Sequence, residues 1–537
     1  MESEFIRSES IFLLLLLFIA VFAGAARRLR VPYPILLTII GGLLGLIRIF
    51  PSVALQPNLV FFVFLPPLLF AAGWQLSWRE FQANLSRILR LAVGLVVFTI
   101  VVLIVGRRWL LPGFDWQSAL LLGAIIGATD AIAATAIARR LGLPRRVVDI
   151  LEAESLVNDG TGLLAFQFSL GILLSGHSPT VIESVGKLVY LSGGGVLVGF
   201  LIGYFASKLE RWIDDGPVEI VVSLLICYSV YIAAQRLHTS GVLAVIACSM
   251  LMSRESYRFM SPQVRLQFAG VWDVMTFVLN GVVFILIGLH LPLVRAQLSG
   301  IGIWRLLQAG AVFSISILLL RLIWIFAETY AVYWYYRLRR DTNNPPPRPR
   351  ELLVLSWGGM RGVLSLAAAF SVPYSLASGQ RSMIVYLTFC LIVTSLVLQG
   401  LTMPSLIRLL AIDSTNDEER EQRNAQRRLV EDVLRYLNRR RVQERFDPAV
   451  VAEMLSIYER RLRTLPLEEL EDGVAVSRMQ RDALLLEVLQ VERTSLIQLR
   501  NDAAISDDVV RSIQRDLDLL ESHVHTGSAG TLLARHR

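Results

Sequence analysis

The feature that most constrains this chain is a series of long apolar segments within its first 410 residues. A helix of about 20 apolar residues crosses a bilayer, because it satisfies its own backbone hydrogen bonds where water is absent. We count thirteen candidate spans, with twelve or fourteen as alternatives, near residues 10–26, 33–50, 57–74, 88–106, 117–138, 151–174, 184–207, 217–235, 238–252, 267–289, 303–335, 351–374 and 382–410. The sequence therefore predicts an all-α integral membrane protein with about 13 transmembrane helices.

The composition agrees with a membrane protein that carries a polar tail. Charged residues make up 18% of the chain, against roughly 25% in an average soluble protein. Residues 1–410 hold 32 basic and 20 acidic groups, whereas residues 411–537 hold 20 basic and 24 acidic groups. We predict a transmembrane domain over residues 1–410 and a helical, cytoplasmic, regulatory domain over residues 411–537.

The positions of Lys and Arg predict the orientation, because cytoplasmic loops are enriched in both. With the N-terminus outside, the inside loops hold twenty basic residues and the outside loops hold about seven. The acidic head of the first segment (Glu2, Glu4 and Glu9) is unlike a signal peptide, so we expect this helix to be retained. These features predict a multi-pass protein of the cell (inner) membrane with a cytoplasmic tail. The basic charge gives no reason to expect a nucleic-acid partner.

Acidic side chains at membrane depth are candidates for function, because burying a carboxylate in the hydrocarbon region is costly. Glu219 and Glu328 lie near span ends, where their side chains could reach the membrane interface. Asp273 lies deeper in its span and could be a buried structural partner. Asp130, Glu154 and Asp159 are harder to explain as surface groups. The full set is Asp130, Glu152, Glu154, Asp159, Glu219, Asp273 and Glu328.

One segment, ESLVNDG at residues 154–160, concentrates polar side chains on a single helix. Glu154 and Asn158 are four residues apart, as are Ser155 and Asp159, so they form two adjacent stripes. Such a face must contact a cavity or another helix rather than lipid. Carboxylate, amide and hydroxyl oxygens are hard ligands, and no thiolate or imidazole accompanies them. The segment therefore predicts a site for a proton or a small hard cation such as sodium, held by Asp159.

Two other spans carry polar residues that are expected to interrupt the helix. Thr129 and Asp130 follow Gly127 in the fifth span, and GGMRG at residues 358–362 lies in the twelfth. These spans hold matching places in two halves of the chain, as paired broken helices do in transporters with inverted repeats. We expect Asp130 at the first break to neutralise one of two groups at the second break: the cation Arg361 or the dipole of a helix end.

Arg321 lies in the middle of the eleventh span and needs an acidic partner. We predict that Glu154 pairs with it, which leaves Asp159 free to titrate. A buried ion pair is weak evidence for stability, because its desolvation can exceed the Coulomb gain. The predicted pair is therefore a structural brace beside the ion site.

Taken together, these segments resemble the sodium/proton exchangers of the cation:proton antiporter superfamily, over about residues 10–410. ESLVNDG at 154–160 is similar to the sixth-helix Asn-Asp signature of that family. FLPPLLFAAG at 64–73, SGVLAV at 240–245 and GGMRG at 358–362 add to the likeness. Many bacterial members have Pro after the acid of the fifth helix, whereas this chain has Ala131.

The resemblance implies thirteen helices, a homodimer, and a core domain that slides against a dimerisation domain. It also implies that Asp159 binds the ion and the proton, surrounded by Asn158, Ser155, Thr129 and Asp130. Antiporters of this kind serve sodium transport and pH homeostasis. The resemblance implies no enzyme activity and no cofactor.

The expected mechanism is competition between one sodium ion and one proton for Asp159. Because Asn158 stands where a second titrating acid could be, the expected exchange is electroneutral and 1:1. Potassium or lithium in place of sodium is an open alternative. An intramembrane enzyme lacks support, since no HExxH motif or Ser–His pair lies at membrane depth. A channel is also possible, but a titratable acid that holds one ion at a time suits a transporter better than a conducting pore.

Overall fold

The computed structural model describes residues 2–29, 32–47, 62–175, 180–213, 215–290, 292, 298, 300–339, 347–373, 378–410, 427, 429–439 and 448–464. The described residues form helices and no strand, apart from one isolated antiparallel bridge that joins Asp130 to Met360. The chain divides into two compact units, Met1–Asn416 and Asp417–Arg537.

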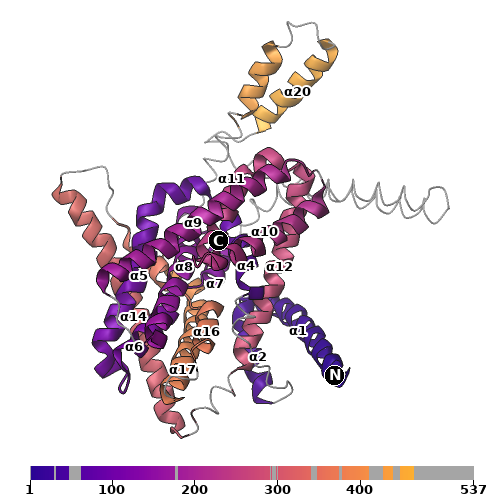
Figure 1. Cartoon of the computed structure of the whole chain (residues 1–537). Coiled ribbons are helices and arrows are strands. Elements are labelled where there is room, and N and C mark those ends of the chain that lie inside the picture. The colour runs from indigo at the N-terminus through magenta and orange to yellow at the C-terminus, as the bar shows by residue number, and fades with distance from the viewer. Residues whose placement is uncertain are drawn as a thin grey trace. The chain divides into compact units, whose positions relative to one another are not determined.

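The first unit is a bundle of helices (Figure 1). In chain order they are α1 (Glu2–Leu29), α2 (Tyr33–Leu46), α4 (Leu65–Gln75), α5 (Trp78–Leu110), α6 (Trp116–Gly127), α7 (Ile132–Arg140), α8 (Arg145–Ser175), α9 (Val181–Glu210), α10 (Gly216–Arg236), α11 (Gly241–Phe259), α12 (Pro262–Leu289), α14 (Ile303–Leu338), α15 (Pro349–Trp357), α16 (Val363–Phe370), α17 (Ser378–Thr394), the π-helix η1 (Ser395–Gln399) and α18 (Gly400–Leu410).

Every segment that the sequence predicts to cross the membrane contains helix in the described residues. Seven of the described helices are long and apolar enough to span a bilayer by length and composition. The predicted all-α membrane fold is therefore confirmed. The total of thirteen crossings and the two inverted repeats stay predictions.

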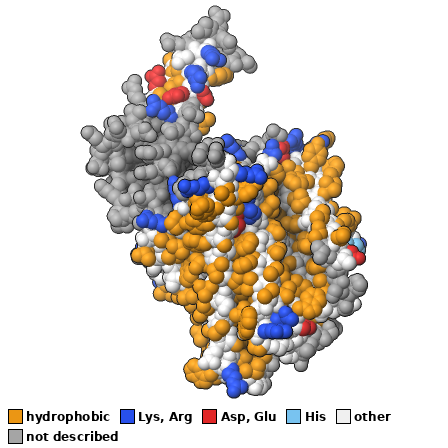
Figure 2. All heavy atoms as spheres, turned by 90° about the vertical axis from the view of Figure 1, so that its left-hand side faces the viewer, with side chains coloured by type: hydrophobic (Ala, Val, Ile, Leu, Met, Phe, Trp, Pro, Cys, Tyr) orange, Lys and Arg blue, Asp and Glu red, His pale blue; other side chains and the backbone are white. Residues whose placement is uncertain are grey.

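Apolar stripes on the outer helices show which faces contact lipid. Val97, Val101 and Val105 follow one another at a spacing of four along α5, and all three are exposed. Figure 2 shows the flank of the unit as a broad hydrophobic surface, with Lys and Arg gathered toward its two ends. Exposed apolar side chains are stable in this pattern because hydrocarbon surrounds them.

Short polar residues start several helices by accepting a hydrogen bond from a backbone N–H of the first turn. This satisfies a donor that the helix itself leaves unpaired. The acceptors are Ser77 at α5, Asp115 at α6, Thr180 at α9, Asp215 at α10, Ser240 at α11 and Ser261 at α12.

The closest helix contacts fall into two sets. α2 packs on α12, and α4 and α9 pack on α11, whereas α5, α6 and α8 pack on one another and α14 packs on α17. Glycine allows the closest of these approaches: a Cβ at Gly288 of α12 would overlap the backbone of α2 at Thr38 and Gly42. Figure 1 shows α12 beside α2 and α14 beside α5.

Two of the predicted spans are broken helices, as the sequence indicates. The fifth is split into α6 and α7 by residues 128–131, and the twelfth into α15 and α16 by residues 358–362. Glycines lower the helix propensity at the second break, and the polar pair Thr129 and Asp130 interrupts the first.

In the second unit, helix is described over residues 429–439 and over α20 (Pro448–Thr464). Pro448 is the first residue of α20. Residues 465–537 of the predicted tail domain lie outside the described residues.

Candidate functional site

The two helix breaks meet inside the first unit. The backbone N–H of Asp130 donates a hydrogen bond to the carbonyl oxygen of Met360 at 2.8 Å. Ser395 in the π-helix supports the second break, because its Oγ accepts a hydrogen bond from the backbone N–H of Arg361 at 3.0 Å. Irregular backbone at membrane depth is thereby satisfied by protein groups instead of water.

Arg361 interacts with a helix end. Its Nη1 donates to the carbonyl oxygens of Gly127 at 3.0 Å and Ala128 at 2.8 Å, at the C-terminus of α6. The carboxylate of Asp130 lies against Gly362, which precedes α16, since a Cβ on that glycine would overlap it. A cation thus faces a helix C-terminus and an anion faces a helix N-terminus, the arrangement that both helix dipoles favour.

Ser155, Asn158 and Thr129 connect α8 to the first break. The Ser155 hydroxyl donates to the backbone carbonyl of Thr129 at 2.7 Å and accepts from the backbone N–H of Ala131 at 3.1 Å. Nδ2 of Asn158 donates to Oγ1 of Thr129 at 3.1 Å. The Oδ1 atom of Asn158 is buried, and no hydrogen-bond partner for it is found among the described residues.

Glu154 and Arg321 form a buried, two-pronged ion pair between α8 and α14. Nη1 and Nη2 of Arg321 donate to Oε1 and Oε2 of Glu154 at 2.7 and 2.8 Å. Arg321 also donates to the carbonyl oxygens of Ser356 and Leu355 in the last turn of α15, both at 3.1 Å. The pair that the sequence predicts is therefore present, and it also holds the carbonyl end of α15.

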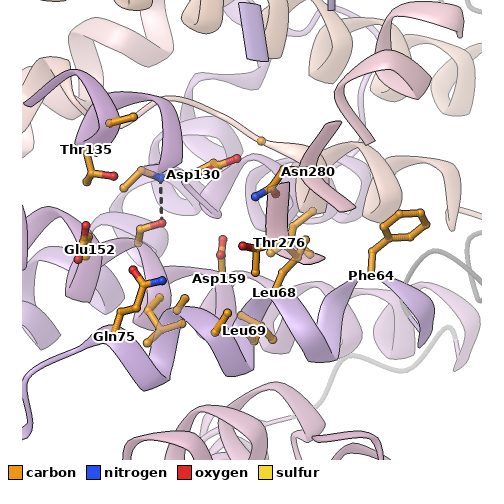
Figure 3. Close-up of a pocket in the computed structure, with 18 of the residues that line it drawn as sticks. Phe64, Leu68, Leu69, Gln75, Asp130, Thr135, Glu152, Asp159, Thr276 and Asn280 are labelled. Carbon is orange, nitrogen blue, oxygen red and sulfur yellow. Dashed lines mark hydrogen bonds between the residues drawn. The ribbon is translucent and has the colours of Figure 1, made fainter. Parts of the chain in front are cut away.

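Asp159 lines a cavity of about 560 Å³ that separates the two sets of helices. Asp130, Ser155 and Asp159 form one wall, and residues of α4 and α12 form the other. Figure 3 shows Asp159 in the middle of the cavity, with Thr276 and Asn280 of α12 across from it. Asp159 is half-buried and lines the cavity, so its carboxylate can be reached from the cavity.

The structure thus brings the five predicted ion-binding residues into one region. Asp159, Ser155 and Asp130 line the cavity, whereas Asn158 and Thr129 lie directly behind its wall. These five residues offer carboxylate, hydroxyl and amide oxygen atoms, a set that suits a small hard cation or a proton.

Several cavity residues were not given a role by the sequence. Gln75 and Glu152 lie toward one end of the cavity, and Thr276 and Asn280 lie opposite Asp159 (Figure 3). A signal was present in α12, because Asp273, Thr276 and Asn280 follow at spacings of three and four and so share one helix face. The sequence does not show which part of the protein this face contacts.

The remaining membrane-depth acids differ from the expectations. Asp273 is exposed on the cavity wall, so the idea of a buried structural partner is wrong. Glu328 forms an ion pair with Arg90 of α5 and is largely buried. Glu219 is fully buried near the start of α10, because α10 packs against α9, α11 and α12. Neither acid is an exposed surface group.

Comparison with known proteins agrees with this geometry. The chain is 32% identical to the Na(+)/H(+) antiporter ApNhaP of Aphanothece halophytica, over 76% of each chain. It is 28% identical to the sodium, potassium, lithium and rubidium/H(+) antiporter of Bacillus pumilus, over 89% of this chain and 73% of that protein. The structure of the sodium proton antiporter MjNhaP1 from Methanocaldococcus jannaschii at pH 8 has a similar fold, with a TM-score of 0.60 and 21% identity, over 76% of this chain and all of that one.

The family described as "Sodium/hydrogen exchanger, transmembrane" matches residues 14–409, which include both helix breaks, the cavity and the polar segment of α8. This multi-pass membrane protein belongs to the sodium/hydrogen exchanger family of antiporters.

Proposed function

We propose that this antiporter exchanges one sodium ion for one proton at Asp159. The observation that carries the proposal is the position of this carboxylate: it lines a cavity between two sets of helices, next to two helix breaks. The Asp159 carboxylate, with the neutral oxygen atoms of Ser155, Asn158 and Thr129 nearby, can hold either a proton or a sodium ion. Exposing it alternately to the two sides would couple the two fluxes.

The neighbouring groups have distinct proposed roles. Ser155, Asn158 and Thr129 supply or orient oxygen ligands for sodium, and the available Oδ1 of Asn158 is a candidate ligand. Asp130 and Arg361 stabilise the helix ends at the breaks. Glu154 and Arg321 brace α8 against α14, so that the Glu154 carboxylate does not compete for the ion.

The cavity between two sets of helices also supports a moving core. We propose that α5 to α8 and α14 to α18 move as a core against α1, α2, α4 and α9 to α12. The second set would form the dimerisation surface of a homodimer. Cross-linking of the purified protein in membranes, followed by mass determination, would test the dimer.

The orientation and the tail are further parts of the proposal. The excess of Arg in alternate loops supports an N-terminus outside the cell membrane and residues 411–537 in the cytoplasm. The tail is proposed to regulate exchange. Protease accessibility of tags at the two termini would test the orientation, and truncation after Ile412 would test the regulation.

Transport in proteoliposomes tests the central claim. Asp159→Asn should abolish sodium-driven proton movement, because the amide can neither titrate nor neutralise a cation. Asp115→Asn is the matched control, since Asp115 caps α6 outside the cavity and Asn caps a helix equally well. Full exchange by the Asp159→Asn variant would refute the site.

Two additional measurements refine the mechanism. An imposed membrane voltage should not change the rate if exchange is 1:1, and voltage-driven net exchange would refute electroneutrality. The name of the Bacillus pumilus relative includes potassium and lithium, so titration with each cation should decide between sodium and these alternatives.

A further inference from the structure

A second acid, Glu152, lies on the same wall of the cavity as Asp159. Glu152, Ser155 and Asp159 follow at spacings of three and four along α8, so all three share one face of the helix, and all line the cavity. Seven residues of helix separate the two acids by about 10 Å along the axis. Figure 3 shows Glu152 toward one end of the cavity and Asp159 in its middle.

The end that carries Glu152 is open to solvent. Gln75 at the end of α4 and Arg139 in the last turn of α7 are both exposed and both line the cavity. Farther in, Ser155 and Asn280 are buried. An ion that enters from this end therefore passes Glu152 before it reaches Asp159.

Glu152 is held by a cation at this entrance. Nη2 of Arg139 lies 2.6 Å from Oε1 of Glu152, and the two side chains are 55% and 22% exposed. Ion pairs this exposed contribute little to stability. Their charges nevertheless act on any ion that passes, because the Coulomb interaction extends over about a Debye length, ~10 Å at 0.1 M salt.

We propose that Glu152 attracts sodium into the cavity and that Arg139 sets the strength of this attraction by partly neutralising it. The inference rests on the proposed function, because Asp159 is the destination of the ion. Asp273, exposed on the opposite wall, adds a negative charge that the pair does not cancel. Glu152 is thus a positioning residue for the cation and Arg139 its modulator.

Sodium-dependent exchange at fixed pH in proteoliposomes tests the proposal. Glu152→Gln leaves Arg139 as an unpaired cation at the entrance, so the KM for sodium should rise about three- to tenfold with kcat nearly unchanged. Arg139→Gln should lower this KM by about two- to fivefold, and Glu152→Asp should restore most of the wild-type value. Adding choline chloride should shrink each difference, because salt screens the charges.

Arg211 and Glu255 provide the matched control, since they form an ion pair of similar exposure, 46% and 21%, that does not line the cavity. Arg211→Gln and Glu255→Gln should leave the KM for sodium unchanged. The proposal is overturned if Glu152→Gln gives the same KM as Glu255→Gln, if it lowers kcat without raising KM, or if its effect is independent of salt. These results would leave the role of Asp159 intact, whereas an active Asp159→Asn variant would refute the proposed function itself.

Discussion

The backbone N–H of Asp130 donates to the carbonyl oxygen of Met360 at 2.8 Å, and this bond joins the two helix breaks of the membrane unit. Residues more than 200 positions apart along the chain thus share one hydrogen bond beside the ion-binding cavity. The side chain of Asp130 lies against Gly362 at the start of α16. The breaks are therefore a single structural unit, and a change at either should affect both.

The first prediction concerns Gly359, which lies directly under the guanidinium of Arg321. A Cβ at this position would overlap the Cζ atom of Arg321. Gly359→Ala should therefore displace Arg321 from Glu154, lower the thermal unfolding midpoint in detergent, and reduce exchange strongly. Gly193→Ala is the control, because nothing lies within 4 Å of its Cβ position within α9. That control should be neutral or stabilising by up to about 1 kcal/mol, since Ala favours helix over Gly.

The second prediction concerns the charges of Glu154 and Arg321. Glu154→Gln leaves the buried Arg321 without its counter-charge, which should cost about 3–5 kcal/mol. The double variant Glu154→Gln with Arg321→Met removes both charges and should recover much of that loss, although the carbonyl oxygens of Ser356 and Leu355 then lose a donor. Thermal unfolding of the single and double variants measures the coupling, and additive effects would contradict a direct pair.

Much of this site can be predicted from the sequence, because short segments and single residues carry the signals. The pattern of residues 154–160 places the polar side chains on one helix, and the charge of Arg321 at membrane depth requires an acid. Glycines next to Arg361 likewise predict a broken helix. In each case the free-energy cost of placing a polar group in hydrocarbon leaves only a few possible local structures and partners for that residue.

What the sequence did not predict depends on contacts between distant segments. That Arg361 binds the carbonyl end of α6 rather than an acid follows from how the breaks cross. The exposed position of Asp273 follows from which face of α12 turns to the cavity. The Arg361 contact leaves no periodic signal, because it joins one side chain to a carbonyl group more than 200 residues away. The spacing of Asp273, Thr276 and Asn280 marks a polar face of α12, but it does not show what that face contacts.

The third prediction concerns Ser155, whose hydroxyl joins α8 to the first break. Ser155→Ala leaves the buried carbonyl of Thr129 and the N–H of Ala131 without this partner, which should cost about 1–3 kcal/mol. Exchange should fall as the break loses its fixed geometry, and Ser155→Thr should retain more activity than Ser155→Ala.

Ser169 supplies the comparison for this test, since it is equally buried in α8 but its hydroxyl donates only to the Ala165 carbonyl of its own helix. Ser169→Ala should therefore change neither stability nor exchange appreciably. If both serine variants behave alike in unfolding and transport measurements, the bridge to the break has no special role.

The last prediction follows from competition at Asp159. If a proton and a sodium ion exclude one another there, the apparent KM for sodium should rise as the pH falls, because more of the carboxylate is protonated. In the range where the proton occupies most sites, each pH unit should raise KM about tenfold, while the maximal rate at saturating sodium changes little. Initial rates of sodium uptake into proteoliposomes, measured over a matrix of sodium concentrations and pH values, give both quantities. A KM that is independent of pH, with only the maximal rate changing, would mean that the two ions bind at separate sites, and the single-carboxylate mechanism would then be wrong.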